Sequence, residues 1–210
     1  MIVVFGSINV DLITPVPHLP ARGETVLGGN YALVAGGKGA NQALAAARGA
    51  AAGQRVAMVG TVGPDAWGAL ALEPLRAAGA DLGAVATGRA HTACGFISVD
   101  PAGQTLITVS PGANMETRAA QLDVLSLTEN DRLVLQMEVA LEENWKALDR
   151  AKRVGARRVL NLAPAMPVGE DVLAALDMLI VNQPEALTIG RTLGLGATDH
   201  IEIARTLATR

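Results

Sequence analysis

Short apolar runs alternate with longer amphipathic stretches along most of the chain. Ile2–Gly6 is apolar and rich in β-branched residues, which predicts a buried strand. Further strands are predicted at residues 55–62, 132–136, 158–162 and 178–181. Helices are predicted at residues 39–52, 66–78, 142–153, 172–176, 184–193 and 201–209. Because helices separate these strands, we predict an α/β fold with a mostly parallel sheet and helices on both faces.

Two regions interrupt this alternation and predict a second, smaller sheet. Residues 14–29 contain three prolines and three glycines, a composition typical of loops and edge strands. Short strands are predicted at residues 25–27, 30–34, 92–99 and 105–110, the last two joined by a turn at 100–103. We expect these strands to form a lid beside the larger domain. The predicted division is an α/β domain of residues 1–12, 35–91 and 112–210, and a lid of residues 13–34 and 92–111.

The composition argues against several classes of protein. The chain has 210 residues, a net charge of −3 and an isoelectric point of about 5.6, so neither nucleic acid nor an anionic membrane is an expected partner. The single cysteine, Cys94, excludes an internal disulfide and fits a reducing compartment. No apolar run is long enough to span a bilayer, and no secretory signal pattern is present. We therefore expect a cytoplasmic protein.

Polar and apolar side chains alternate directly after the first strand. Ser7, Asn9 and Asp11 share one face of the extended chain, and Ile8 and Val10 share the other. This pattern is typical of a half-buried strand with one solvated face. It is also the pattern of a strand that presents three polar side chains to a ligand, and the spacing leaves both interpretations open.

A glycine-rich turn before the first predicted helix is the clearest candidate for chemistry. Gly36, Gly37 and Gly39 flank Lys38, one of three lysines among 17 basic residues. Glycine lets the backbone approach a ligand closely, and a helix N-terminus favours oxygen-rich or anionic groups. The spacing matches neither the phosphate loop nor the dinucleotide-binding pattern, so Lys38 and Asn41 suit sugar hydroxyls better than nucleotide phosphates. The alternative is a tight strand-to-helix connection with an incidental lysine.

Two further groups follow predicted strands. Glu138 comes just after the strand at 132–136, and ligands of open α/β sheets bind beyond the carboxyl ends of strands. The alternative for Glu138 is an ordinary solvated glutamate. Asn182 and Glu185 have the spacing of a helix capping box, and they also suit the binding of phosphates and of a hydrated Mg²⁺ ion. The three histidines are scattered, so we predict neither a zinc site nor a Cys/His nucleophile pair.

These residues resemble the ribokinase branch of the ribokinase/PfkB carbohydrate kinases. Gly6-Ser7-Ile8-Asn9-Val10-Asp11 resembles the first-strand motif of that family, and residues 36–43 resemble its sugar-loop signature. Residues 60–68, 111–114 and 182–185 also resemble family segments at corresponding places. The resemblance runs from residue 2 to the end of the chain and implies a ribokinase-like fold.

The resemblance also implies an activity, the transfer of the γ-phosphate of ATP to the 5-hydroxyl of D-ribose. Carried over by position, the residues that would contact the sugar are Asn9, Asp11, Gly37, Lys38, Gly39, Asn41 and Glu138. Asn182 would approach the ATP phosphates, and Glu185 would help to hold Mg²⁺ through water. The lid would cover the sugar and pair with the lid of a second subunit in a homodimer.

The sequence departs from the family pattern in one respect. The family has a G-A-G-D-type segment that supplies the general-base Asp and an anion hole, and residues 1–210 contain no such segment. We therefore expect no catalytic residue in this chain, and we expect the base, the adenine-binding loops and the K⁺ site downstream, as in a C-terminally truncated ribokinase. The alternative is a catalytically inactive sugar-binding or regulatory fragment. Ribose, 2-deoxyribose and a nucleoside all remain open as the substrate.

Overall fold

The larger of two sheets is parallel throughout and has six strands. The computed structural model describes residues 1–196 and 199–209. The strand order is β10-β9-β8-β1-β4-β5. The strands are β1 (Ile2–Phe5), β4 (Val56–Val62), β5 (Asp81–Thr87), β8 (Arg132–Leu135), β9 (Arg157–Asn161) and β10 (Met178–Ile180). This arrangement confirms the predicted parallel α/β sheet.

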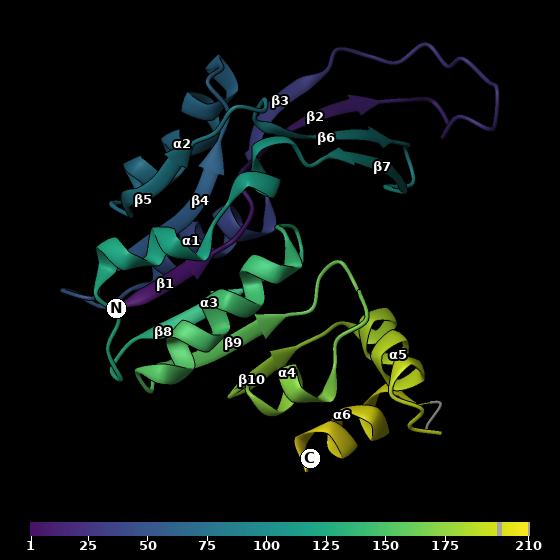
Figure 1. Cartoon of the computed structure of the whole chain (residues 1–210). Coiled ribbons are helices and arrows are strands. Elements are labelled where there is room, and N and C mark those ends of the chain that lie inside the picture. The colour runs from purple at the N-terminus through teal and green to yellow at the C-terminus, as the bar shows by residue number, and fades with distance from the viewer. Residues whose placement is uncertain (197–198, 210) are drawn as a thin grey trace.

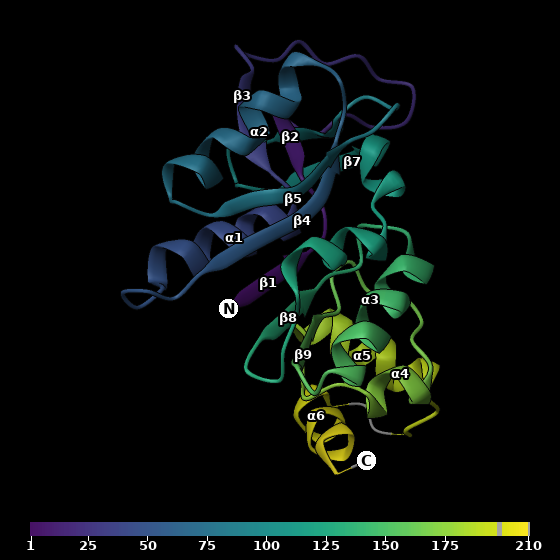
Figure 2. The same cartoon turned by 60° about the vertical axis from the view of Figure 1, so that its left-hand side comes forward.

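Helices cover both faces of this sheet, because alternate side chains of each strand point in opposite directions. Val4 packs in a core cluster with residues of α1 (Lys38–Gly49) and α2 (Ala66–Ala77). Val3 and Phe5 pack in a second cluster with residues of the remaining helices. Those helices are α3 (Leu141–Arg153), α4 (Glu170–Ala174), α5 (Gln183–Thr192) and α6 (His200–Ala208). Figure 2 shows α1 and α2 on one side of the strands and α3 on the other.

The smaller sheet has four strands in the order β3-β2-β6-β7. These are β2 (Asn9–Pro15), β3 (Ala32–Gly36), β6 (Ala93–Val99) and β7 (Thr105–Ser110), and Figure 1 shows them projecting together from one end of the larger sheet. β2 continues across the predicted domain boundary between residues 12 and 13, and β3 across that between residues 34 and 35. The division into an α/β domain and a lid therefore stays a prediction.

Some predicted elements were wrong or missing. The strand expected at residues 25–27 is irregular chain, and Leu27 at its end is 89% exposed, so this segment has no neighbouring surface on which to bury an apolar face. β5 was not predicted, because its small residues carry no clear alternation and its pairing with β4 supplies the order. The 3₁₀ helices η1 (Gly112–Glu116) and η2 (Ala119–Leu125) were also missed. Among the described residues, no helix has the length and apolar character needed to cross a bilayer.

The order of the strands reverses at β1. The chain places β4 and β5 on one side of β1 and then returns to place β8, β9 and β10 on the other side. In open α/β sheets such a reversal leaves a crevice beyond the carboxyl ends of the two strands where the order changes. The segments that follow β1 and β8, which include Ser7 and Glu138, therefore lie at the position where a ligand is expected.

Asp65 joins the helix α2 to the start of the lid strand β6. Its Oδ1 atom accepts hydrogen bonds from the backbone N–H groups of Trp67 and Gly68 and from the Thr92 hydroxyl, at 3.1, 3.1 and 2.8 Å. Its Oδ2 atom accepts the Thr92 N–H at 2.7 Å. Burial pushes the pKa of Asp65 up, but the combined hydrogen bonds from Thr92, Gly68 and Trp67 outweigh it and lower the pKa.

Replacing Asp65 by Asn should destabilise the protein in a pH-dependent way. Because the folded-state pKa of Asp65 is lowered, its contribution is present above the unfolded-state pKa of about 3.9 and is lost as the pH falls through the folded-state value. We expect wild type to exceed D65N by about 1 kcal/mol in free energy of unfolding at neutral pH, because Asn can still cap the helix but accepts neutral hydrogen bonds in place of charge-assisted ones. Chemical denaturation at neutral and acidic pH measures this difference. If the difference in free energy of unfolding between wild type and D65N does not shrink in acid, the pKa of Asp65 is not lowered by folding.

Candidate functional site

The buried Ser7 hydroxyl lies at the centre of the candidate site. Its Oγ atom donates to Glu138 Oε2 at 2.6 Å and accepts the Gly39 N–H at 3.2 Å. The Ser7 carbonyl accepts the Ala40 N–H at 2.8 Å. Ser7 follows β1, Glu138 follows β8, and Gly39 is in the first turn of α1. One small side chain therefore connects the two central strand ends to a helix N-terminus.

The glycine turn is shaped by close contact with the chain beside Ser7. Gly37 has a φ of 91°, a value that residues with a side chain rarely adopt. A Cβ atom on Gly37 would lie 2.8 Å from the Asn9 backbone nitrogen and 2.9 Å from the Ser7 carbonyl oxygen. The turn is therefore a tight strand-to-helix connection, as one interpretation expected. The same geometry places Lys38 beside the strand ends.

Lys38 and Glu138 meet across the site. The Glu138 Oε2 atom accepts the Lys38 backbone N–H at 3.1 Å, and the Lys38 Nζ atom lies 3.8 Å from Glu138 Oε1. The Glu138 side chain is 16% exposed and that of Lys38 is 40% exposed. Glu138 is thus not an ordinary solvated glutamate, because its carboxylate is part of the interior face of the turn.

Asp11 completes this charged group from strand β2 of the smaller sheet. Burial is the largest cause that raises the pKa of Asp11, the Glu138 carboxylate raises it further, and the Lys38 ammonium acts in the opposite direction. Gly36 on β3 and Gly95 on β6 leave room for the carboxylate, since a Cβ atom at either position would collide with it. No residue of the described chain donates a hydrogen bond to this partly buried carboxylate.

Asn9 is held by a residue to which the sequence assigned no role. The Asn114 Nδ2 atom donates to Asn9 Oδ1 at 2.7 Å, and the Ile8 N–H donates to Asn114 Oδ1 at 2.9 Å. Asn114 comes from η1, far along the chain, so only its place within the predicted family segment 111–114 pointed to it. Asn9 and Asp11 lie two residues apart on β2 and therefore on the same face.

Asn41 lies on the same side of α1 as Lys38. It is three residues further along the helix, its N–H donates to the Gly37 carbonyl at 2.9 Å, and its side chain is exposed. Gln42 beside it points inward, and its Oε1 accepts from Gln136 Nε2 at 2.6 Å. The structure therefore brings Asn9, Asp11, Gly37, Lys38, Gly39, Asn41 and Glu138 to one end of the larger sheet.

Asn182 and Glu185 lie at the end of β10, two strands away from β8. The Asn182 N–H donates to Glu185 Oε2 at 2.7 Å, and the Glu185 N–H donates to Asn182 Oδ1 at 2.9 Å. The predicted capping box is thus present at the start of α5. Because all six strands are parallel, this box lies at the same carboxyl edge of the sheet as the Asp11 group. The described residues contain no group of three or more His, Cys, Asp or Glu arranged to hold a metal ion.

Substitutions of Lys38 and Glu138 should shift the pKa of Asp11 in opposite directions. Lys38→Met removes a nearby positive charge and should raise that pKa, while Glu138→Gln removes a negative charge and should lower it. NMR titration of the Asp11 carboxyl carbon measures both shifts, with the Asp65 carboxyl carbon as the internal control. Shifts in the same direction, or none, would mean that the three side chains are not close together.

Known proteins resemble this chain in sequence and in structure. A ribokinase of Haemophilus influenzae is 34% identical over 186 residues, which cover 87% of this chain and 60% of that protein. A ribokinase structure from Thermotoga maritima has a TM-score of 0.87 at 30% identity, and the match covers 99% of this chain and 68% of the Thermotoga chain. An Arabidopsis thaliana ribokinase complexed with ribose and ATP has a TM-score of 0.81 at 26% identity, and the match covers 99% of this chain and 68% of the Arabidopsis chain.

The matches extend over almost the whole chain but not over the whole of the relatives. The chain spans about 60% of the length of the Haemophilus protein. A family model for pfkB family carbohydrate kinases matches residues 1–209. The parallel sheet, the separate four-stranded sheet and these matches together show that the chain belongs to the pfkB family of carbohydrate kinases.

Proposed function

We propose that this protein is a ribokinase-type sugar kinase that transfers the γ-phosphate of ATP to the 5-hydroxyl of D-ribose. The main support is the partly buried Asp11 carboxylate, to which no described residue donates a hydrogen bond. It lies close to Lys38 and to Glu138, the residue that follows β8 beside the reversal of the strand order. A carboxylate in such a place is suited to accept hydrogen bonds from sugar hydroxyls, which would restore the hydration lost on burial. The ribokinases among the similar proteins support ribose as the sugar.

The polar groups around Asp11 are suited to orient the sugar. Asp11 would accept from hydroxyls, Asn9 would donate to a sugar oxygen, and Lys38 and Asn41 would bind from the helix side. Gly37 and Gly39 let the turn pack against the chain beside Ser7, and their backbone would contact the sugar from that position. Glu138 keeps the turn in place through its bonds to Ser7 and Lys38, and it would contact the sugar as well. Holding one hydroxyl in line with the phosphate is the main task of a phosphoryl-transfer site.

Asn182 and Glu185 suit the nucleotide side of the reaction. The exposed Asn182 amide at the start of α5 would approach the phosphates, which the helix N-terminus favours. Mg²⁺ would supply charge neutralisation on the phosphates and is commonly held by one or two carboxylates together with waters. Glu185 is suited to hold Mg²⁺ through water, because the capping box engages its Oε2 atom and Glu185 is the one carboxylate in the first turn of α5.

The proposed transfer also needs groups that residues 1–210 do not supply. We propose that the general base, the anion hole and a K⁺ site come from a segment outside these residues, as the missing G-A-G-D motif suggests.

We further propose that the lid excludes water from the sugar and pairs with a second lid, since Phe96, Leu106 and Ile107 on its strands are about half exposed at 46%, 49% and 55%. ATP as co-substrate supports a cytoplasmic location. The second candidate is a catalytically inactive sugar-binding or regulatory chain.

Ribose binding should depend on Asp11. Calorimetry with residues 1–210 should detect ribose binding. Asp11→Asn should raise the Kd for ribose at least about tenfold, because a charged acceptor becomes a neutral amide that also carries donors. Asp100→Asn is the matched control, since Asp100 makes its bonds within the lid turn to Ala102 and Gln104. Equal weakening by both substitutions, or no ribose binding by wild type, would contradict the proposed sugar site. Titration with 2-deoxyribose in parallel tests the choice of pentose.

The kinase and inactive candidates differ in phosphate transfer. A chain that includes the downstream segment should release ADP from MgATP in the presence of ribose and K⁺, whereas an inactive protein would bind ribose without releasing ADP. In an active chain, Glu185→Gln should raise the Mg²⁺ concentration needed for half-maximal rate by several fold, since one charge near the ion is lost. Glu202→Gln on the exposed surface of α6 is the matched control. An unchanged Mg²⁺ dependence would remove Glu185 from the proposed metal site.

A further inference from the structure

We propose that Asn114 is a positioning residue that sets which atom of the Asn9 amide faces the sugar. This inference rests on the proposed sugar site and adds to it a determinant that lies outside the sugar-contacting residues. It concerns the orientation of one side-chain amide, which decides whether the site offers a donor or an acceptor beside Asp11.

The orientation follows from a backbone group that can only donate. Asn114 is 1% exposed, and the Ile8 N–H points at its side chain at 2.9 Å, so the carbonyl oxygen of Asn114 must face Ile8. The Asn114 NH₂ group must then face the other way, toward Asn9, at 2.7 Å. A donor requires an acceptor, so Asn9 must turn its Oδ1 atom toward Asn114. The backbone of Ile8 thereby determines the orientation of two successive amides.

The remaining atom of Asn9 is its Nδ2 donor, and this atom is available to a ligand. Asn9 is only 4% exposed, and its Nδ2 donates to no atom of the described chain. The fully enclosed side-chain atoms without a partner in the described residues are Gln136 Oε1 and Asn144 Oδ1, so Asn9 Nδ2 is not enclosed. Because Asn9 and Asp11 share a face of β2, the site offers a donor next to a carboxylate acceptor. That pair matches a sugar hydroxyl, which both donates and accepts.

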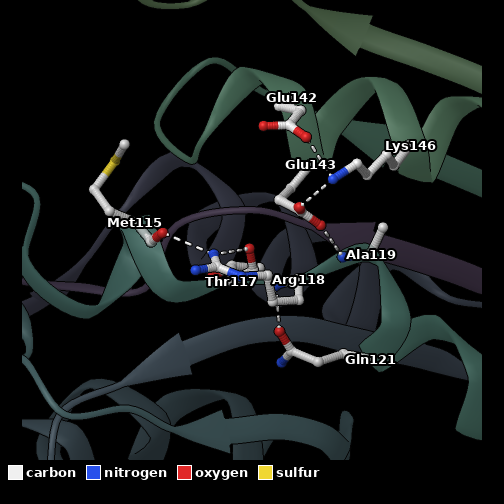
Figure 3. Close-up of polar contacts among 8 residues, drawn as sticks. All are labelled: Met115, Thr117, Arg118, Ala119, Gln121, Glu142, Glu143 and Lys146. Carbon is white, nitrogen blue, oxygen red and sulfur yellow. Dashed lines mark hydrogen bonds and ion pairs between the residues drawn. The ribbon is translucent and has the colours of Figure 1, made fainter.

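The segment that carries Asn114 is anchored at both ends. Before it, the Ala113 N–H donates to the His91 carbonyl at 2.8 Å. After it, the Arg118 Nη1 atom donates to the Met115 and Thr117 carbonyls at 2.9 and 3.0 Å, as Figure 3 shows. These bonds restrict the position of Asn114, so it can orient Asn9 before a ligand arrives.

The first turn of α3 holds the following segment. Figure 3 shows the Glu143 carboxylate between the Ala119 N–H, at 2.8 Å, and the Lys146 ammonium, at 2.9 Å. The Gln121 Nε2 atom donates to the Gly60 and Ala84 carbonyls at 2.7 and 3.0 Å, which joins η2 to β4 and β5. The support for Asn114 therefore comes from His91 and Arg118 directly, and from the larger sheet and α3 through η2, whereas Asn9 belongs to the smaller sheet.

Asn114→Asp tests the proposal directly. The carboxylate introduced by this substitution still accepts the Ile8 N–H, but its second oxygen cannot donate, so the Asn9 amide should turn and present Oδ1 to the sugar beside Asp11. We expect the Kd for ribose, measured by calorimetry, to rise about tenfold. The single proton of the hydroxyl goes to Asp11, so the hydroxyl oxygen would face Asn9 Oδ1 as two acceptors where wild type has a hydrogen bond. Asn114→Ala frees the Asn9 amide without reversing it and should raise the Kd by about threefold.

Deoxy sugars separate positioning from general structural damage. Ribose analogues that lack the 1-, 2- or 3-hydroxyl should be compared on wild type and both variants. For the one analogue that lacks the hydroxyl contacted by Asn9, the substitutions should change the Kd little. Damage to the fold would instead raise the Kd of every sugar by the same factor. If N114D does not fold, as thermal unfolding would show, N114A gives the same pattern at smaller amplitude.

The outcomes distinguish this inference from the proposed function. A wild-type chain that binds no pentose would overturn the sugar site and the role of Asn114 with it. A wild-type chain that binds ribose, together with variants that bind it equally well or that lose all sugars equally, would overturn only the role of Asn114.

Discussion

The hydrogen bonds of the Ser7 hydroxyl connect the three parts on which the site depends. Ser7 is fully buried where β1 ends, and its Oγ atom lies between the Glu138 carboxylate and the Gly39 N–H. Burying most of the Glu138 carboxylate, whose side chain is 16% exposed, costs free energy unless hydrogen bonds compensate for the lost hydration. Ser7 and the Lys38 N–H supply that compensation. The same bonds place the lysine of the glycine turn beside the carboxylate that follows β8.

The site is a cluster of charges of which one member has no hydrogen-bond donor from the described chain. Glu138 is engaged by Ser7 and Lys38, whereas Asp11 is surrounded by Gly36 and Gly95 and receives no donor from the described residues. Burial and the nearby Glu138 raise its pKa against the opposing effect of Lys38, and carboxylates perturbed in this way cluster at functional sites. The two glycines leave the space that this carboxylate occupies.

Structural roles and proposed functional roles coincide at the two helix starts of this edge. At α1, the tight turn that the φ of Gly37 requires is also what brings Lys38 to the strand ends. At α5, the capping box of Asn182 and Glu185 satisfies helix donors and also holds a carboxylate at the carboxyl edge of the sheet. Asp65, in contrast, is engaged by Thr92 and the start of α2, so its role is to connect α2 to the residue before β6 of the smaller sheet.

The sequence alone determined the α/β class, most helices and strands, and the residues at the strand ends, because apolar periodicity and glycine turns are local properties. It could not predict β5, since the order of that small-residue strand comes from pairing with β4, nor exclude the strand at 25–27, since Leu27 looks apolar until its exposure is known. Only the tertiary structure decided that Ser7 bridges Glu138 and Gly39, and that Asn114 orients Asn9. Those contacts join residues more than 30 positions apart, and no local pattern specifies which donor will meet which acceptor across such a separation.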